Sequence, residues 1–304
     1  MSFFIGIDGG GTKTRCILGD DRHELARGSA SSCKVQRVGE ACARHSLAAA
    51  IHEACVQAGI SPQQIARTCA GITGSARAEI ASVMRRLVGG IVGGEVEVVG
   101  DVEIAFEDAF NVGQGVIVIA GTGSIAYGRN LSGEVARAGG WGWAVSDEGS
   151  GHWVGTEAVR AVLRARDRGQ PTQLLPEIQD ALGAKSFDDF IVKLNASPGP
   201  DYSTLFPVVA SSGGNGDSLA AEVLHRAGNE LANMTGVVVN RLCEGQACSV
   251  AMHGGVFSGS SIVRQSFFEA LCVQSPQASL LQRVIDPARG ALERARRGFN
   301  VVGA

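Results

Sequence analysis

The sequence lacks the features that mark membrane, secreted and nucleic-acid-binding proteins. No apolar run reaches the roughly 18 residues that a membrane-spanning helix needs. Met1 to Asp8 carry no basic stretch and run straight into a carboxylate, so we expect no signal peptide and a cytoplasmic protein. The formal net charge of -3 provides no excess of basic side chains for a phosphate backbone. We therefore expect neither a membrane nor a nucleic-acid partner.

Cysteine patterns typical of metal sites are also missing. The eight cysteines are scattered, without a C-x-x-C pair, in a chain far larger than a disulfide-stapled mini-domain. Reduced thiols in the core or in a pocket are the expected state. The cysteines are Cys16, Cys33, Cys42, Cys55, Cys69, Cys243, Cys248 and Cys272.

Glycine is the residue that the sequence has in excess. The 42 glycines follow no fixed period, and hydrophobic residues make up 45% of the chain, which excludes a collagen-like or disordered protein. They are expected at tight turns and where backbone approaches a ligand. The length of 304 residues exceeds the usual size of a single core, so two domains are expected.

Hydrophobic periodicity predicts two similar series of elements. In the first series, strands are expected at 3–8, 14–18, 24–29, 68–72 and 96–99, and helices at 41–58, 76–87 and 102–110. In the second, strands are expected at 116–120, 124–129, 135–139, 249–252 and 281–285. Its helices are expected at 154–166, at 219–243, after residue 260 and at 287–297, with long loops at 197–200 and 211–217.

The two series are similar enough to be one β-β-β-α-β-α unit present twice. This predicts an α/β fold with two duplicated domains around a cleft. The first domain is expected at 1–112, with the C-terminal helix 286–304 packing on it. The second is expected at 113–285 and contains a helical insertion.

The first glycine-rich motif lies in the turn between the first two expected strands. Three glycines let backbone N–H groups converge on a phosphate, threonine hydroxyls add donors, and Asp8 at the strand end can hold Mg²⁺ through water. A Walker A loop is excluded, because the residue order differs and the chain continues as a strand. A plain glycine hairpin is the structural alternative. The residues expected to bind nucleotide are Gly9, Gly10, Gly11, Thr12, Lys13 and Thr14.

A second motif occupies the equivalent turn of the second series. Its residues are Gly121, Thr122, Gly123 and Ser124. Read alone it imitates a dinucleotide-binding fingerprint, but that fingerprint must open a helix, whereas 124–129 and the turn at 130–133 indicate another hairpin. A phosphate-binding hairpin in each half suits a polyphosphate, and the pair is a stronger signal than either motif alone.

With two further blocks, these motifs resemble those of the actin, heat-shock-ATPase and sugar-kinase superfamily. Within it the chain is similar to the BadF/BadG/BcrA/BcrD ATPase family, which includes N-acetylglucosamine and glucosamine kinases. The further blocks are His253-Gly-Gly-Val256, similar to the adenosine motif, and the stretch from Gly139-Gly-Trp-Gly142 to Asp147-Glu-Gly-Ser-Gly151. The resemblance covers essentially the whole chain. It implies an actin-like, ribonuclease H-like fold, ATP and Mg²⁺ as cofactors, phosphorylation of the 6-hydroxyl of an amino sugar such as N-acetylglucosamine, and a homodimer.

Nucleotide contacts follow from the resemblance by position. Thr12 and Thr122 would contact ATP phosphates, and Gly254 and Gly255 would lie under the adenosine. Glycines after a strand also leave room for a flat base, and a following helix offers its N-terminus as partial positive charge. Glycine used for packing alone is the alternative.

Asp101 follows the apolar strand 96–99 and Gly100, at a strand end. In the similar sugar kinases an aspartate at this position takes the proton of the attacking hydroxyl. Phosphoryl transfer nevertheless depends mostly on positioning and charge neutralisation. Capping of the following helix is the structural alternative for Asp101, and both roles can coexist.

The block around Asp147 places a carboxylate beside aromatic side chains, as a sugar with polar and apolar faces requires. The resemblance implies sugar-binding positions at Thr73, Asp101, Gly140, Trp141 and Asp147. Alternatively, Asp147 and Ser150 serve the start of the next helix while Trp141 and Trp143 lie in the core.

The chain departs from these kinases in the loop after the third strand. Relatives often place a sugar-binding asparagine there, whereas this chain has Ser31-Ser32-Cys33, and a thiol is a poor substitute for an amide. Cys33 is thus expected at the sugar, and the choice between N-acetylglucosamine and glucosamine stays open. An ATPase that activates an acyl-CoA dehydratase or reductase is a further alternative, although the cysteine spacing does not favour the iron–sulfur cluster that it needs.

Overall fold

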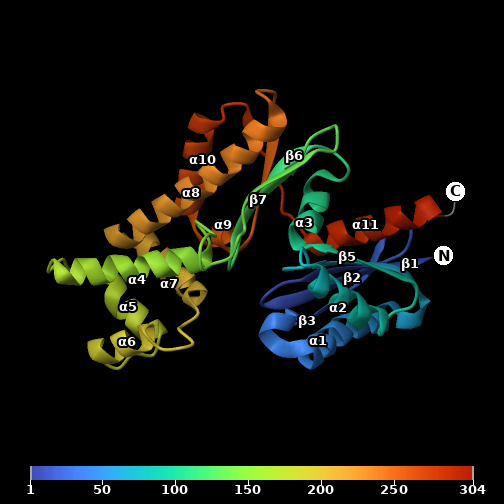
Figure 1. Cartoon of the computed structure of the whole chain (residues 1–304), viewed down its shortest axis with the longest axis horizontal. Coiled ribbons are helices and arrows are strands. Elements are labelled where there is room, and N and C mark those ends of the chain that lie inside the picture. The colour runs from blue at the N-terminus through green and yellow to red at the C-terminus, as the bar shows by residue number, and fades with distance from the viewer. Residues whose placement is uncertain (1, 303–304) are drawn as a thin grey trace. The chain divides into compact units, whose positions relative to one another are not determined.

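The chain forms two compact units, each built on one five-stranded mixed sheet (Figure 1). The structure is a computed structural model and describes residues 2–302, with side chains through Gly298. Unit 1 consists of Met1–Gly113 and Arg283–Ala304, and unit 2 of Gln114–Gln282. The expected α/β class with a duplicated sheet is confirmed. No helix within residues 2–302 combines the length and the apolar character needed to cross a bilayer.

Unit 1 has the strand order β3-β2-β1-β4-β5. The first three strands form an antiparallel meander, and β4 and β5 continue the sheet in parallel with β1. The strands are β1 (Phe3–Gly9), β2 (Lys13–Gly19), β3 (Glu24–Ser31), β4 (Ile65–Ile72) and β5 (Glu95–Gly100). The helices are α1 (Val35–Ala58), the 3-10 helix η1 (Pro62–Gln64), α2 (Ala78–Gly89), α3 (Asp101–Phe110) and α11 (Pro287–Val302).

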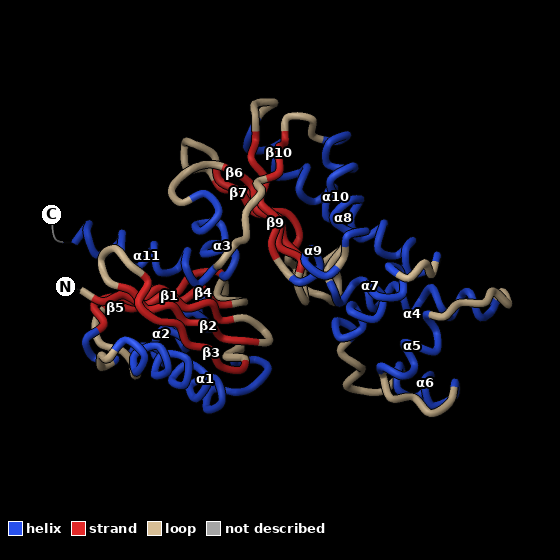
Figure 2. The backbone as a smooth tube through the Cα atoms, turned by 180° about the vertical axis from the view of Figure 1, so that it is seen from behind, coloured by secondary structure: helices blue, strands red, loops and turns tan. Residues whose placement is uncertain are grey.

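Helices cover both faces of this sheet, α1 and α2 on one side and α3 and α11 on the other (Figure 2). The period-2 alternation of β1 requires this arrangement, because successive side chains point to opposite faces. Ile5 and Ile7 are buried with Leu47 of α1, whereas Phe4 is buried with Leu292 of α11. The C-terminal helix therefore completes one of the two hydrophobic cores of unit 1.

Unit 2 repeats the topology with the strand order β10-β9-β6-β7-β8. Here β6 to β8 form the antiparallel meander, and β9 runs parallel to β6 and to β10. The strands are β6 (Gly115–Ala120), β7 (Ser124–Arg129), β8 (Val135–Gly139), β9 (Cys248–His253) and β10 (Ala278–Leu280). By position in the sheet, β6 and β9 correspond to β1 and β4.

The helices of unit 2 include a large insertion between β8 and β9. They are α4 (Gly151–Asp167), α5 (Leu174–Ala181), α6 (Phe187–Leu194), the 3-10 helix η2 (Tyr202–Leu205), α7 (Phe206–Gly214), α8 (Ser218–Cys243), α9 (Gly255–Gly259) and α10 (Ser261–Gln274). Side-chain caps fix where the long ones begin: Ser150 accepts from the Trp153 amide at α4, and Asp217 from the Ala220 amide at α8.

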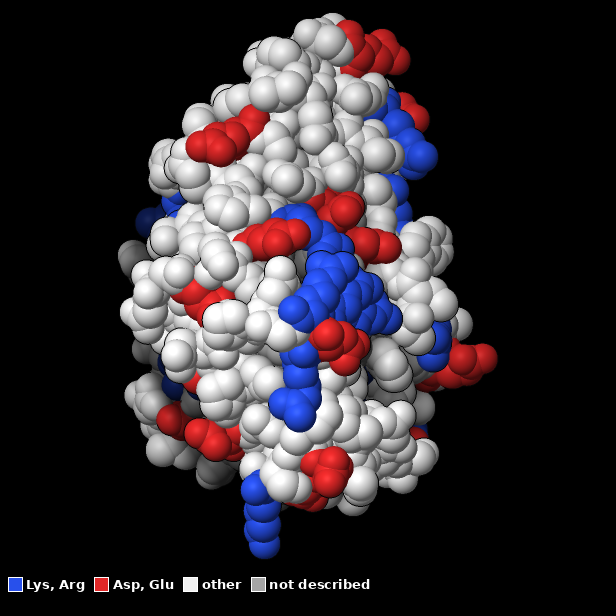
Figure 3. All heavy atoms as spheres, turned by 90° about the vertical axis from the view of Figure 1, so that its left-hand side faces the viewer, with Lys and Arg blue, Asp and Glu red and all other residues white. Residues whose placement is uncertain are grey.

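One face of the molecule shows how its charges are distributed (Figure 3). Lys and Arg side chains gather there in one patch that Asp and Glu side chains border. Opposite charges are also paired on the helices of unit 2, where Glu157 of α4 accepts from Arg160 of the same helix at 2.6 Å and from Arg226 of α8 at 3.0 Å.

Three expectations about local structure are wrong. The apolar run 281–285 is not a strand; the edge strand is β10, which ends at Leu280. Much of the expected loop at 211–217 belongs to α7, where Val209 and Ser212 are buried. Cys243 and Cys248 form a disulfide, so the expectation of reduced thiols fails for this pair, while the other six cysteines are free.

Candidate active site

The first glycine-rich turn closes the β1–β2 hairpin of unit 1. Ser32 donates its hydroxyl to the Gly10 carbonyl at 3.2 Å, and the Arg37 guanidinium donates to the Gly11 carbonyl at 3.0 Å. Within residues 2–302, the backbone amides of Gly11 and Thr12 have no hydrogen-bond acceptor. A turn with fixed carbonyls and available amides suits an anion. Sequence reasoning missed Ser32 and Arg37, because no spacing in the sequence signals their contacts.

The residues around this turn differ in how far their side chains are exposed to solvent. The side chains of Thr12 and Lys13 are exposed, as nucleotide ligands require. Gly9 is buried. Thr14 is completely buried, and its hydroxyl donates to the Ser31 carbonyl at 2.8 Å. The expectation that the Thr14 side chain binds nucleotide is therefore corrected, since this hydroxyl holds β2 to β3.

Asp8 lies near the end of β1, and its pKa is raised from 3.8 to about 6. Burial is the main cause, and repulsion from Asp101 and Asp286 adds to it while Arg15 opposes it. A divalent cation would relieve both effects. No cluster of three or more His, Cys, Asp or Glu side chains able to hold a metal is found within the described chain. A cation at Asp8 would therefore need water or ligand oxygens as well, as Mg²⁺ commonly does.

Asp101 is the first residue of α3, directly after β5. The Thr73 hydroxyl donates to its Oδ2 at 2.6 Å, and the Val102 amide donates to its Oδ1 at 3.0 Å. Thr73 follows β4, and its amide donates to the Gly9 carbonyl at 3.1 Å. Because β1, β4 and β5 are parallel, their C-terminal ends bring Asp8, Thr73 and Asp101 to one edge of the sheet, where open α/β sheets bind ligands.

Two expectations about this edge are corrected. The N-cap of α3 is Gly100, so Asp101 does not cap the helix, and its Oδ2 is bound by Thr73 instead. Cys33 is completely buried, and burial raises the pKa of its thiol. A Cβ added at Gly9 would lie only 2.7 Å from the Cys33 sulfur, so the thiol packs directly against the glycine turn and is not exposed to a sugar.

The second glycine-rich turn closes the β6–β7 hairpin of unit 2. The carbonyls of Gly121 and Thr122 accept from the amides of Gly151 and His152, at 2.8 and 3.3 Å, at the start of α4. Across residues 2–302, the amides of Thr122 and Gly123 have no acceptor, and the Thr122 side chain is exposed. Each unit thus presents a glycine turn with available donors.

Asp147 anchors the glycine- and tryptophan-rich block to this second turn. The carboxylate is 8% exposed and accepts from the backbone amides of Gly142, at 3.3 Å, and Ser124. Burial raises its pKa, and those two hydrogen bonds oppose the rise. The Ser124 hydroxyl is also buried and donates to the Glu148 carbonyl at 2.7 Å. The Ser124 hydroxyl therefore holds local structure, whereas the Asp147 carboxylate keeps acceptor positions beyond these two amides, and its contact with the sugar stays a prediction.

Trp141 and Trp143 do not lie in the core, so that part of the alternative is wrong, whereas Ser150 does cap the next helix, α4. Trp141 is 70% exposed and Trp143 is 67% exposed. The Arg137 guanidinium lies 4.0 Å from the centre of the Trp141 ring, and Trp143 packs on His152 with 5.0 Å between ring centres. Trp141, Arg137 and Arg241 line an open hollow of about 610 Å³. Gly140, beside Trp141, is exposed as well.

The two glycines of the expected adenosine motif differ. Gly254 has a φ of +111°, and a Cβ there would lie 2.3 Å from the Ala120 carbonyl oxygen, so only glycine fits. Gly255 is exposed, and a Cβ there would meet no atom within 4 Å. The helix that follows, α9, has only five residues, so the expected support from a helix dipole is weaker than the sequence indicated.

Two copies of one sheet topology define a duplicated α/β protein. In each copy the glycine turn carries two backbone amides that have no acceptor among residues 2–302. The chain belongs to the BadF/BadG/BcrA/BcrD ATPase family, whose family model matches residues 5–295. It is 33% identical to the N-acetylmuramic acid/N-acetylglucosamine kinase of Clostridium acetobutylicum, over 97% of this chain and 99% of that one.

Two further relatives also match over nearly their whole length. The N-acetyl-D-glucosamine kinase of Dictyostelium discoideum is 28% identical, over 95% of this chain and 96% of its own. A crystal structure from Chromobacterium violaceum, assigned as an N-acetylglucosamine kinase, superposes with a TM-score of 0.78 at 25% identity, covering 96% of this chain and 98% of that one.

Proposed function

We propose that this chain is an ATP-dependent kinase that phosphorylates the 6-hydroxyl of an amino sugar, with N-acetylglucosamine as the preferred substrate. The observation that carries the proposal is the edge of the unit 1 sheet, where Asp8, Thr73 and Asp101 meet beside a glycine turn with available amides. Membership of the ATPase family and full-length similarity to two kinases of N-acetylated amino sugars support it.

Asp101 is the proposed base. The 6-hydroxyl oxygen forms its bond to the γ-phosphorus as the bond between that phosphorus and the bridging oxygen of ADP breaks, and the hydroxyl proton passes to the Asp101 carboxylate. The Thr73 hydroxyl holds one carboxylate oxygen in place. Thr73, expected at the sugar, is thus proposed to act through Asp101. Orientation matters here because phosphoryl transfer depends mainly on alignment.

Mg²⁺ would be held at Asp8 and would neutralise phosphate charge when bound. The carboxylate fits this role, because burial and the neighbouring Asp101 make its charge costly without a cation. The turn amides in each unit would contact the phosphates, and the open position at Gly255 would accept the adenosine. The residues proposed for ATP are Gly9, Gly10, Gly11, Thr12, Lys13, Gly121, Thr122, Gly123, Gly254 and Gly255.

The exposed Trp141 ring and the neighbouring Gly140 are the proposed sugar contacts in unit 2. An aromatic face packs well against the apolar C–H surface of a sugar. Asp147 stays a proposed sugar contact, whereas Cys33 is completely buried and would affect the sugar only through the loop that it holds. A cytoplasmic location and a homodimer are also part of the proposal, and light scattering in solution tests the latter.

The test is ADP release with Mg²⁺-ATP and a panel of N-acetylglucosamine, N-acetylmuramic acid, glucosamine and glucose. We expect release that depends on the sugar, fastest with N-acetylglucosamine, and a 6-phosphate as product. Release at one rate with and without sugar would overturn the kinase assignment and favour an ATPase that activates another enzyme. If glucosamine were turned over faster, the kinase activity would stand but glucosamine would replace N-acetylglucosamine as the preferred substrate.

A further inference from the structure

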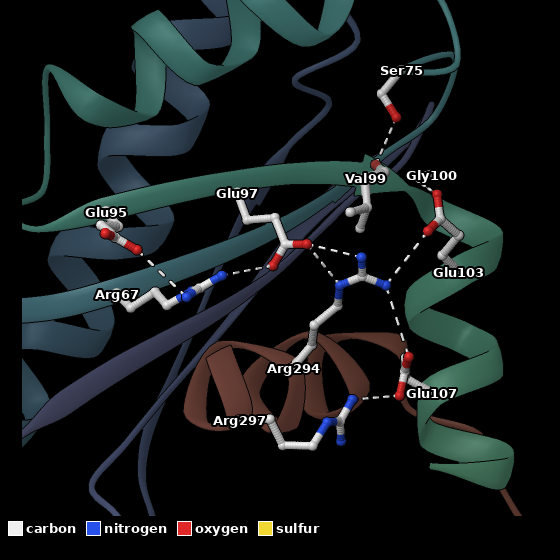
Figure 4. Close-up of polar contacts among 10 residues, drawn as sticks. All are labelled: Arg67, Ser75, Glu95, Glu97, Val99, Gly100, Glu103, Glu107, Arg294 and Arg297. Carbon is white, nitrogen blue, oxygen red and sulfur yellow. Dashed lines mark hydrogen bonds and ion pairs between the residues drawn. The ribbon is translucent and has the colours of Figure 1, made fainter. Parts of the chain in front are cut away.

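A cluster of ion pairs ties α11 to the strand and helix on either side of Asp101 (Figure 4). Arg294 of α11 is at its centre. The Arg294 guanidinium donates to Glu97 Oε1 from Nε at 3.0 Å and from Nη2 at 2.8 Å. Its Nη1 donates to Glu103 Oε2 at 3.4 Å and lies 3.7 Å from Glu107 Oε1. One cation of the C-terminal helix therefore contacts β5 and two turns of α3.

Glu103 connects this cluster to the backbone where β5 ends and α3 begins. While its Oε2 faces Arg294, its Oε1 accepts from the Gly100 amide at 3.0 Å. Gly100 directly precedes Asp101. From the other side, the Ser75 hydroxyl donates to the Val99 carbonyl at 2.6 Å. Side chains from two directions thus fix the backbone immediately before Asp101, as Figure 4 shows.

The cluster is partly shielded from solvent, which strengthens its electrostatic contacts. The Arg294 side chain is 26% exposed and that of Glu107 only 6%. Burial lowers the pKa of Arg294, but its hydrogen bonds and charge interaction with Glu97 outweigh this and raise it overall. Arg67 supports Glu97 from the neighbouring strand at 3.3 Å. The guanidinium that holds Glu103 therefore stays charged and fixed from several sides.

We infer that Glu103, held by Arg294, is a positioning residue for Asp101. It fixes the direction in which α3 leaves β5 and thereby the place of the carboxylate that receives the proton. The inference rests on the proposed function, because that function makes Asp101 the base. A purely structural ion pair would affect the unfolding temperature alone. A positioning residue also lowers kcat in the folded protein while the KM for ATP stays close to that of the wild type.

Three variants separate these roles. Glu103→Ala removes the acceptor for the Gly100 amide, and we expect kcat to fall by about ten- to a hundred-fold, the range for a slightly misplaced reacting group. Glu103→Gln keeps an acceptor oxygen for that amide and should restore most of kcat. Arg297→Gln is the matched control, because it removes another α11–α3 ion pair, to Glu107, that does not reach Gly100. It should lower Tm but leave kcat close to that of the wild type.

Kinetics are measured with both substrates saturating, after thermal unfolding has confirmed the fold of each variant. Unchanged kcat in Glu103→Ala, or an equal loss in Arg297→Gln, would overturn the inference. Should Glu103→Ala fail to fold, Glu103→Asp decides, since it keeps the charge but is too short to span to the Gly100 amide; a wild-type kcat there would also overturn it. Failure of the proposed function looks different: Asp101→Asn would then turn over normally, or the wild type would need no sugar.

Discussion

The Thr73 hydroxyl donates a 2.6 Å hydrogen bond to Oδ2 of Asp101. The two residues follow β4 and β5, which are neighbouring parallel strands, so the bond joins two strand ends at one edge of the sheet. It also commits the threonine proton to the carboxylate, so that the hydroxyl is no longer a free donor for a sugar. The geometry therefore favours orientation of Asp101 as the role of Thr73.

Asp101→Asn should lower turnover by about 10²–10⁴, the usual loss when a general base is removed. An amide has nearly the shape of the carboxylate but does not accept the sugar proton. Nucleotide affinity should stay near that of the wild type, because the proposed ATP contacts come from other residues. Steady-state kinetics and calorimetry with ATP measure the two effects, and normal turnover with every sugar tested would show that Asp101 is not the base.

Thr73→Val tests the orienting bond separately. Valine matches threonine in shape but has no hydroxyl, so kcat should fall to a level between those of the wild type and Asp101→Asn. Thr73→Ser keeps the donor to Asp101 and serves as the control, with kcat near that of the wild type. Equal kcat in the valine and serine variants would contradict an orienting role for this bond.

Gly255→Val should weaken ATP binding with a smaller effect on sugar binding. The protein itself leaves room for the new side chain, because a Cβ at Gly255 meets no atom within 4 Å, so the clash arises only when adenosine is bound. Gly214→Val, in α7, is the matched control, since a Cβ added at Gly214 would also meet no atom within that distance. Calorimetry compares the two folded variants, and equal ATP affinities would place the adenosine elsewhere.

Asp8→Asn should stabilise the protein at pH 8 while lowering kinase activity. The folded-state pKa of Asp8, about 6, exceeds the unfolded value of 3.8, so this carboxyl destabilises the fold increasingly as pH rises between those values. The gap corresponds to at most ~3 kcal/mol, which partial solvent exposure reduces. The gain of the variant should therefore shrink as pH falls from 7 to 5. Urea unfolding at several pH values measures it.

Asp20→Asn is the control, because it should change the stability at pH 8 in the opposite direction to Asp8→Asn. Backbone amides of His23 and Arg22 donate to the Asp20 carboxylate at 2.7 Å each and hold its pKa below 3.8. Its charge therefore stabilises the fold above that value, and the stabilisation is lost as pH falls through the folded-state pKa. At pH 8 the Asp20 variant should be less stable than the wild type. If both variants lost stability at pH 8, the charge on Asp8 would not be costly.

Sequence periodicity predicted the elements whose ends are marked by turn residues. The strands expected at 124–129 and 135–139 are β7 and β8 with the same bounds, since the turn at 130–133 separates them. The strand predicted from the apolar run at 281–285 is absent, because apolar residues form a strand only where a neighbouring strand offers hydrogen bonds. Val284 is 87% exposed, and this segment connects β10 to α11. The disulfide was missed because Cys243 and Cys248 become neighbours only where α8 turns into β9.

For the candidate site, sequence located the turns but not the direction of each side chain. Glycine spacing identified both hairpins, yet the Thr14 and Ser124 hydroxyls bond to backbone carbonyls, which only the packing of neighbouring segments decides. Glu103 lies three residues after Gly100, the spacing at which a glutamate can accept from the N-cap amide, but a capping box also needs Ser or Thr at the N-cap, so the sequence signal was incomplete. Arg294 lies 191 positions further along the chain, and no local pattern connects it to Glu103.

Trp141→Ala should reduce the preference for N-acetylglucosamine over glucosamine. In the proposed site the Trp141 ring shelters the acetyl methyl, and filling a small apolar niche is typically worth about 1–3 kcal/mol, or roughly 10–200-fold in discrimination. The ratio of kcat/KM between the two sugars measures the effect. Trp143→Ala is the matched control, because Trp143 is nearly as exposed but packs on His152, and its loss should leave the ratio unchanged. If Trp141→Ala lowered kcat/KM equally for both sugars, the ring would serve only to hold Arg137. The argument for specificity would then be wrong, but the kinase proposal would not be affected.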